Sequence, residues 1–279
     1  MRVTRPTDLG SVRVPAGQVR RERRLETLHV VWHALGPFVL LLVAWQLATW
    51  LWNLGRAVLP SPVDVAAETW RILRGGILLD YVGRSLTRLM ATASVVIPLG
   101  VALGMLIGLV GWASGALMPI FRYFTAIPAI AWLPVFLVAF GFNETSIVAT
   151  AAYSFLFPVV YNTLVGVQTV PVILQHAVRT LGGGPARVIR DVLLPGSLPA
   201  IVAGIRLGFG YGWRSLIAGE MLVAQGGLGH MLFKAQSVGF APRMLAGMVT
   251  IGLLALAIDS FLLEPLEEAT IRRWGTVRT

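Results

Sequence analysis

The chain has 279 residues, of which 56% are hydrophobic and only 13% are charged, with a net charge of +10 and no cysteine. Soluble domains are about 45–50% apolar and about 25% charged. The composition therefore excludes a soluble enzyme, a disordered protein and a nucleic-acid-binding protein, and the lack of cysteine excludes disulfides and thiolate metal sites. An all-α polytopic membrane protein remains.

Six apolar stretches are long enough to cross a membrane, because a helix needs about 20 apolar residues to cross about 30 Å of hydrocarbon. The predicted spans are residues 35–54, 89–110, 124–142, 145–165, 198–218 and 244–263. Pro128, Pro134 and Pro158 interrupt the third and fourth spans, and prolines are tolerated in such helices where neighbours satisfy the freed carbonyls. We therefore expect about six transmembrane helices.

The segments around these spans predict the organisation of the chain. In order, they are a basic tail at 1–28, a first transmembrane helix at 29–54, an external loop with an amphipathic helix at 55–88, a core at 89–266 and a C-terminal tail at 267–279.

Arginine is abundant in the basic tail, in the loop 168–197 and near the C-terminus. Basic segments next to membrane spans usually face the cytoplasm, so we expect both termini to be cytoplasmic. The external loop disagrees with this orientation, because it contains Arg56, Arg71, Arg74, Arg84 and Arg88.

The single lysine, Lys234, is followed by Ala235, and no glycine-rich phosphate-binding loop precedes it. A P-loop needs a lysine followed by serine or threonine. If the work of this protein is driven by ATP, another chain must therefore bind the nucleotide.

Two spans contain glycine at every fourth position. These glycines are Gly100, Gly104 and Gly108 in the second span, and Gly204, Gly208 and Gly212 in the fifth. Small residues at this spacing let helices approach closely in lipid. They predict tight packing, either within one subunit or between two.

The loop 168–197 has the pattern of two short amphipathic helices. Residues 172–181 have helical spacing, Gly182-Gly183-Gly184-Pro185 breaks the helix, and residues 186–194 resume it until Leu194-Pro195 ends it. Such a pair of helices is typical of a docking element for a soluble partner, but it also suits helices that lie on the lipid surface.

The spacing in this loop resembles that of ATP-binding-cassette (ABC) importer permeases. Their pattern is Glu-Ala-Ala, three residues, Gly, nine residues, Ile, any residue and Leu-Pro. This chain has His176-Ala177-Val178, then Gly182, then Val192-Leu193-Leu194-Pro195, at the same spacing. His176 replaces the acidic residue and Val178 replaces alanine. The resemblance implies that these residues couple the permease to an ATPase.

Other motifs resemble the permeases for nitrate, sulfonate, taurine and bicarbonate. They include Leu59-Pro60-Ser61-Pro62, Ser85-Leu86-Thr87-Arg88, residues 127–134, Glu220-Met221 and Gly227-Leu228-Gly229. The resemblance covers about residues 55–275 and implies the type I importer permease fold in a bacterial inner membrane. It further implies a permease homodimer in lipid, ATPase subunits that bind ATP and Mg, a periplasmic or lipid-anchored solute-binding protein, and no cofactor on this chain.

Arg206 in the fifth span is the first candidate for the translocation path. At 100° per residue, Trp213 and Glu220 lie within about 40° of Arg206 on the same helix face. Trp132 and Tyr153 are further path candidates, whereas Arg214 and Asp259 are expected to pair structurally. An internal ion pair of Arg206 is the alternative.

An arginine on the path would suit an oxyanion, because guanidinium donors match pairs of oxygens. A membrane-embedded transferase would need clustered acids to hold a metal, but the acidic residues here are scattered. An ion-coupled secondary transporter is a second alternative. His29 and His33 have no third ligand near them in the sequence, so we expect no metal site.

Overall fold

The computed structural model describes residues 36–52, 55 and 58–274, and it divides into two units at Pro62–Val63. In the first unit, the apolar helix Gly36–Trp52 is largely exposed. The indole nitrogen of Trp45 in this helix donates to the carbonyl of Pro60 over 3.1 Å. The predicted basic tail, His29, His33 and the last residues of the C-terminal tail lie outside the described residues.

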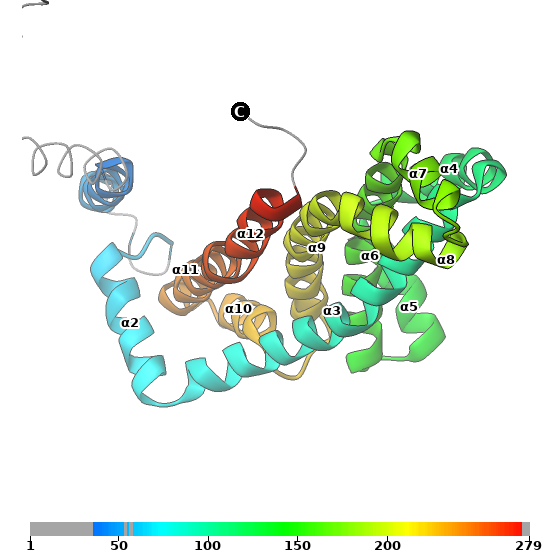
Figure 1. Ribbon diagram of the computed structural model, residues 1–279. Helices are drawn as coiled ribbons and strands as arrows, with labels where there is room; N and C mark the ends of the chain where they lie inside the picture. Colours follow the sequence, from blue (N-terminus) through cyan, green and yellow to red (C-terminus); the bar gives the residue numbers. More distant parts are fainter. Residues whose placement is uncertain (1–35, 53–54, 56–57, 275–279) are drawn as a thin grey trace, which may run out of the picture. The chain divides into compact units, whose positions relative to one another are not determined.

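The described part of the second unit consists of helices joined by short turns (Figure 1). Its elements are α2 (Pro62–Arg74), α3 (Ile77–Leu109), α4 (Gly111–Ala126), the 3₁₀ helix η1 (Ala129–Trp132), α5 (Leu133–Phe140), α6 (Glu144–Thr169), α7 (Val172–Thr180), α8 (Pro185–Val188), the π-helix η2 (Ile189–Leu193), α9 (Leu194–Val223), α10 (Leu228–Ser237), α11 (Ala241–Ile258), the π-helix η3 (Asp259–Leu263) and α12 (Glu264–Trp274).

Helix α6 lies between α3 and α9, and both glycine ridges pack against it. A Cβ atom on Gly104 would lie 2.6 Å from the Cβ of Thr163, and one on Gly208 would lie 2.2 Å from the ring of Phe155. Such distances leave no room for a methyl group, so glycine is what allows the helices to meet. The ridges therefore serve packing within one subunit.

Helix α2 is the amphipathic helix expected in the loop 55–88, and a buried carboxylate fixes it. Glu68, whose side chain is 2% exposed, accepts a hydrogen bond from Nε of Arg243 in α11 over 2.8 Å and another from Arg71.

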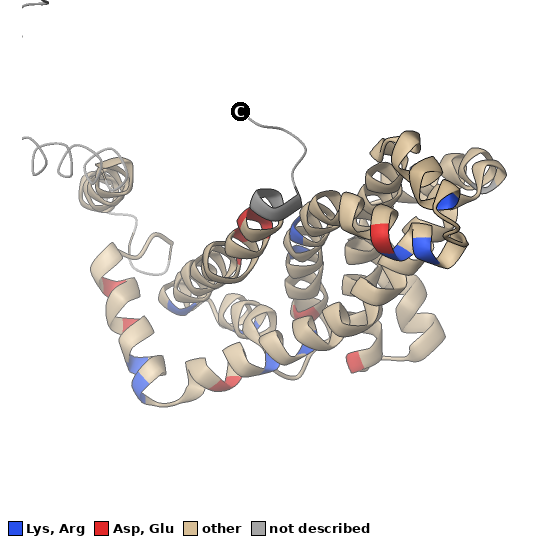
Figure 2. Ribbon diagram, in the orientation of Figure 1, with Lys and Arg blue, Asp and Glu red and all other residues tan. Residues whose placement is uncertain are grey.

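The membrane-length helix α3 starts at Ile77, well before the predicted start at residue 89, and its charged residues lie in its N-terminal third (Figure 2).

The predicted span over 124–142 is broken at Pro128, one of the prolines expected to interrupt it. The segments Ser114–Ala126 and Ala129–Phe140 are bent by 90°. The residue before a proline is forced out of the helical region, and Ile127, before Pro128, has an extended conformation with φ −87° and ψ 119°. The bend therefore follows from Pro128.

The prediction that the helix over 186–194 ends at Leu194-Pro195 is wrong, because this helix runs without a break from Pro185 to Val223. Proline has no N–H to donate. Directly before Pro195, the helix widens into the π-helix η2, in which the amide of Leu194 donates to the carbonyl of Ile189, five residues back. The same arrangement precedes Pro265, where the amide of Glu264 bonds to the carbonyl of Asp259.

Four described helices are long and apolar enough to span a membrane, and a fifth span is obtained if the bent pair counts as one. The helix Gly36–Trp52 is apolar but shorter than a full span in its described part. The number six remains a prediction.

Candidate functional site

Arg206, near the middle of α9, forms ion pairs instead of facing an open path. Its Nε and Nη2 donate to the two carboxylate oxygens of Asp259 in η3, both over 2.7 Å. Its Nη1 donates to Glu267 in α12. A bidentate pair of this kind is strong and directional. The arrangement joins α9 to the C-terminal helices, as in the pairing alternative.

Glu220, near the end of α9, is completely buried in a polar network. It accepts from the hydroxyl of Ser85 over 2.8 and 2.9 Å and from Nη1 of Arg88 over 2.6 Å. Nη2 of Arg88 also donates to Glu144 at the start of α6 over 2.6 Å. The network thus ties together α3, α6 and α9 at the end of the helices that lies farthest from α7.

The turn after α9 completes this network with backbone groups. The amide of Gly229 donates to Glu220 over 3.0 Å, the amide of Leu228 donates to Ser85 over 2.9 Å, and Arg88 donates to the carbonyl of Gly226 over 2.7 Å. Gly227 has φ +108°, a conformation that L side chains rarely adopt. Three separate sequence motifs, Ser85–Arg88, Glu220-Met221 and Gly227–Gly229, therefore meet in one structure.

The expectation that Arg206, Trp213 and Glu220 line a path together is corrected by this arrangement. Trp213 is 5% exposed and Glu220 is 0% exposed. The helical angle put the three side chains on one face correctly, but other helices cover that face. The expected pairing of Arg214 is also wrong within the described residues, since Arg214 is exposed and lies 5.8 Å from the ring of Tyr211.

Arg206→Ala is expected to lower the amount of permease recovered in assembled form several-fold, because the carboxylates of Asp259 and Glu267 lose their cation. Arg214→Ala is the matched control on the same helix and is expected to assemble at the wild-type level. Size-exclusion chromatography of detergent extracts measures both. Equal recovery of the two variants would contradict the structural role of Arg206.

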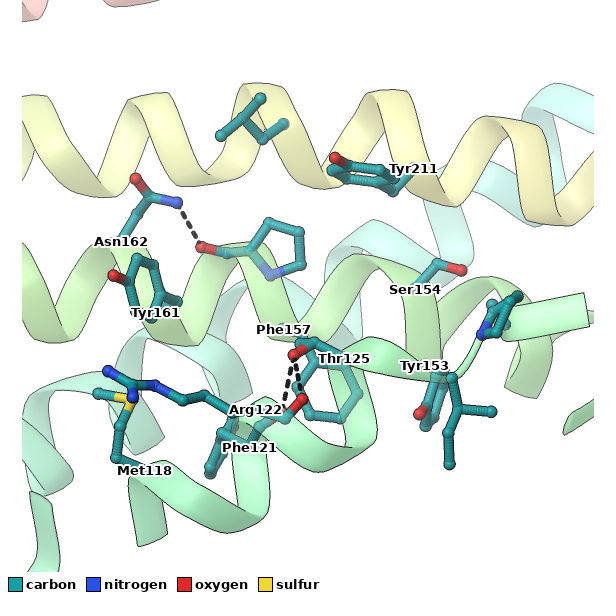
Figure 3. A pocket seen from close by; sticks show the side chains of 15 residues that line it. Met118, Phe121, Arg122, Thr125, Tyr153, Ser154, Phe157, Tyr161, Asn162 and Tyr211 are labelled. Atoms are coloured by element: carbon teal, nitrogen blue, oxygen red, sulfur yellow. Dashed lines mark hydrogen bonds between the residues drawn. The ribbon is translucent and has the colours of Figure 1, made fainter. Parts of the chain in front are cut away.

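An open pocket of about 590 Å³ lies along the middle of α6 and α9, with α4 as its third wall (Figure 3). Tyr153, one of the path candidates, lines it. Trp132 stands behind Tyr153, with its ring centroid 5.4 Å away, and does not itself line the pocket. The pocket also contains Arg122, which sequence reasoning did not select.

The two helices of the loop 168–197 differ in burial. Helix α7 has no buried residue, and His176 and Ala177 are exposed. Val188 and Leu193 of the second helix pack against Val167 and Val170. The second helix is therefore anchored to the end of α6, whereas the first presents apolar side chains outward, with Ile173 71% exposed.

Gly182 joins the two helices in a left-handed conformation with φ +81°. The amide of Gly183 bonds to the carbonyl of Val178, and that of Gly182 bonds to the carbonyl of Arg179. These two bonds define a Schellman motif, which needs a left-handed residue at the position of Gly182. Val192, Leu194 and Pro195 lie in η2 and at the start of α9.

Residues 97–264 match the family described as "Binding-protein-dependent transport system inner membrane component". The chain belongs to this family. The permease is 32% identical over 236 residues to the taurine transport system permease protein TauC of Escherichia coli, covering 83% of this chain and 84% of TauC. It is also 32% identical over 231 residues to the nitrate import permease protein NrtB of Synechocystis, with 80% and 83% covered.

The bicarbonate transport system permease protein CmpB of Synechococcus elongatus is 28% identical, with 84% of the permease and 85% of CmpB covered. Among solved structures, the inward-facing MetNI methionine ABC transporter matches 70% of the permease and 96% of its own chain, with a TM-score of 0.58 and 21% identity. The permease thus has the type I importer fold. It is a multi-pass inner-membrane transport subunit of an ABC importer, not an enzyme, and the carrier and transferase alternatives are set aside.

Proposed function

We propose that the permease forms the membrane path for a small oxyanion. The names of its relatives support this proposal, since taurine, nitrate and bicarbonate each carry a planar or tetrahedral group of oxygens that share a negative charge. The open pocket at the middle of α6 and α9 supplies a place for such a solute within the membrane-spanning part.

The helix pair α7–α8 is proposed to dock on an ATPase subunit that binds ATP and Mg. The observation that carries this proposal is the exposed apolar surface of α7, next to a second helix that is anchored on the end of α6. A surface helix with exposed isoleucine and leucine side chains gains stability when a partner covers it. His176, Ala177 and Val178 lie on this helix. The exposed His176 and Ala177 are proposed to face the ATPase, whereas Val178 packs inward against the cluster that contains Val188 and Leu193.

Gly182→Val is expected to leave the permease in the membrane but to uncouple ATP hydrolysis from solute uptake. A β-branched residue resists the left-handed conformation at φ +81°, so the two helices of the docking element lose their relative orientation. Uptake and ATPase activity, each measured per recovered complex, test this prediction.

Gly184→Ser is the matched control for Gly182→Val. A Cβ atom at either glycine has nothing within 4 Å, but Gly184 has φ −75°, which suits any residue. Serine is also favoured at the start of a helix. Wild-type uptake by Gly182→Val would reject the docking role.

The importer is proposed to contain two copies of the permease with ATPase subunits, a periplasmic or lipid-anchored solute-binding protein and surrounding lipid. Closed two-fold symmetry is the commonest arrangement of identical subunits. Native mass measurement of the purified complex tests the copy number. A complex with one copy and a different second permease would reject the homodimer.

Both termini are proposed to be cytoplasmic. The arginines of the loop 55–88 contradicted this orientation in the sequence, but three of them form ion pairs: Arg71 with Glu68, Arg84 with Asp80, and Arg88 with Glu144 and Glu220. The orientation rule counts Lys and Arg rather than net charge, so the proposal rests on the basic tail and on the basic segments at 168–197 and near the C-terminus, which agree with one another.

A further inference from the structure

Arg122 lies at mid-depth in the helix bundle, although its position between the predicted spans 89–110 and 124–142 suggested a loop. Ser114, earlier in α4, accepts a hydrogen bond from Gln168 near the end of α6. The ring of Phe121 then meets Phe157, near the middle of α6, at 5.5 Å between centroids. Helix α4 thus runs back along α6, and Arg122 reaches the level of the middle of that span.

The guanidinium of Arg122 has no acidic partner among the residues that the structure describes. Arg88, Arg206 and Arg243, which also belong to apolar helices, each hold at least one carboxylate. Arg122 is exposed and faces the pocket of about 590 Å³. A charged side chain at membrane depth is costly and usually faces a water-filled cavity with a functional role.

Two further hydroxyl groups of the pocket, those of Tyr161 and Tyr211, likewise have no hydrogen-bond partner in the described part of the chain. Tyr161 and Tyr211 line the pocket and are 51% and 52% exposed. In Figure 3, the guanidinium of Arg122 lies on the same side of the pocket as Tyr161 and Asn162. The pocket therefore offers one cation and two hydroxyl groups that have no hydrogen-bond partner among the described residues. The other polar side chains of its wall, those of Thr125, Tyr153, Ser154 and Asn162, already bond to protein groups.

We propose that the oxyanion group of the transported solute binds in this pocket against the guanidinium of Arg122, with Tyr161, on the same side of the pocket, as a further donor. The planar guanidinium presents paired N–H groups to paired oxygens. This proposal rests on the proposed function, because it names the residues that bind the solute in the proposed membrane path. Arg122 is thus a binding residue that sets the preference for anions.

The first test compares uptake by Arg122→Gln, Arg122→Lys and Tyr123→Leu in cells that carry the complete importer. The probes are labelled nitrate, taurine, an alkanesulfonate and bicarbonate, and uptake is divided by the amount of complex recovered. Tyr123 is the matched control, since it is the next residue of α4, is 66% exposed and does not line the pocket.

Arg122→Gln is expected to lower uptake per complex about tenfold or more, the loss typical of a hydrogen bond to a charged group. Arg122→Lys retains part of the uptake, and Tyr123→Leu retains all of it. Wild-type uptake per complex by Arg122→Gln overturns the proposal. If the wild-type importer accumulates none of the four probes, the proposed oxyanion function itself is wrong.

A second test uses the absence of cysteine from the chain. In Arg122→Cys, a thiosulfonate reagent that carries an ammonium group restores a positive charge after assembly, and one that carries a sulfonate adds a negative charge. Uptake is expected to recover only with the ammonium reagent, while the wild type shows the effect of each reagent on partner chains. Equal uptake after both reagents overturns the proposal, even if Arg122→Gln fails to assemble.

Discussion

Arg88→Met is expected to prevent stable assembly of the permease. Arg88 provides the positive charge opposite Glu220, which is 0% exposed. Methionine keeps the apolar stem but leaves Glu220 as a buried carboxylate without a cation. Removal of one partner from a buried ion pair typically costs about 3–5 kcal/mol, which is a large fraction of the stability of most proteins. Recovery from detergent and the melting temperature of the complex measure the effect.

Arg84→Met is the matched control for this prediction. Arg84 lies one turn before Arg88 in α3 and pairs with Asp80, but both side chains are more than half exposed. Exposed pairs contribute about 0–1 kcal/mol, so this variant should assemble normally. Glu220→Gln, introduced together with Arg88→Met, should restore part of the recovery, because the amide still accepts from Ser85 and Gly229 without a buried charge. Equal recovery of Arg88→Met and Arg84→Met would show that the network does not hold the helices together.

Gly208→Ala is expected to force α6 and α9 apart. The added Cβ atom would lie 2.2 Å from Cδ2 and 2.4 Å from Cε2 of Phe155, a ring that is 0% exposed and packed on all sides. Overpacking of this kind costs about 1–3 kcal/mol. The measurement is the melting temperature of the purified complex.

Gly210→Ala, in the same helix, separates the effect of steric overlap with Phe155 from the general effect of replacing a helical glycine by alanine. A Cβ atom at Gly210 has nothing within 4 Å, and alanine is a better helix former than glycine by about 1 kcal/mol. Gly210→Ala should therefore be as stable as the wild type or slightly more stable. Phe155→Leu in the Gly208→Ala background should recover part of the loss. If the two glycine variants melt at the same temperature, the close contact with Phe155 is not a constraint.

Local chemistry explains which features of the fold were predictable. The glycine ridges, the amphipathic helix in the loop 55–88 and the glycine break at Gly182 each follow from residues close in sequence. The partner of the two ridges did not follow, because periodicity identifies a helix face but not the helix that covers it. Both ridges turned out to contact α6.

The roles of Arg206 and Glu220 show the same limit. A helical angle placed them on one face of α9 but says nothing of height along the bundle. Asp259 and Glu267 meet that face near its middle, whereas Ser85 and Arg88 meet it near its end. These partners are distant in sequence, so only the tertiary arrangement reveals them.

Arg122 is not among the sequence candidates because it falls between the predicted spans 89–110 and 124–142. The charge-free stretch 89–121 is longer than one span requires, which was the available signal. The structure resolves this excess with a sharp turn at Val110, so that α3 ends at Leu109 and α4 starts at Gly111. The charge then falls within a helix instead of a loop.

The unbroken helix from Pro185 to Val223 has a mechanical consequence. Its first turns belong to the proposed docking element, and Glu220 lies near its other end. Because no flexible loop intervenes, the backbone hydrogen bonds make α9 behave as a stiff rod. If α9 pivots about η2 by about 5°, the distant end moves by about 3–4 Å at 1.5 Å of rise per residue. A small angular change at the proposed docking element is thereby converted into a larger displacement at the opposite end of α9.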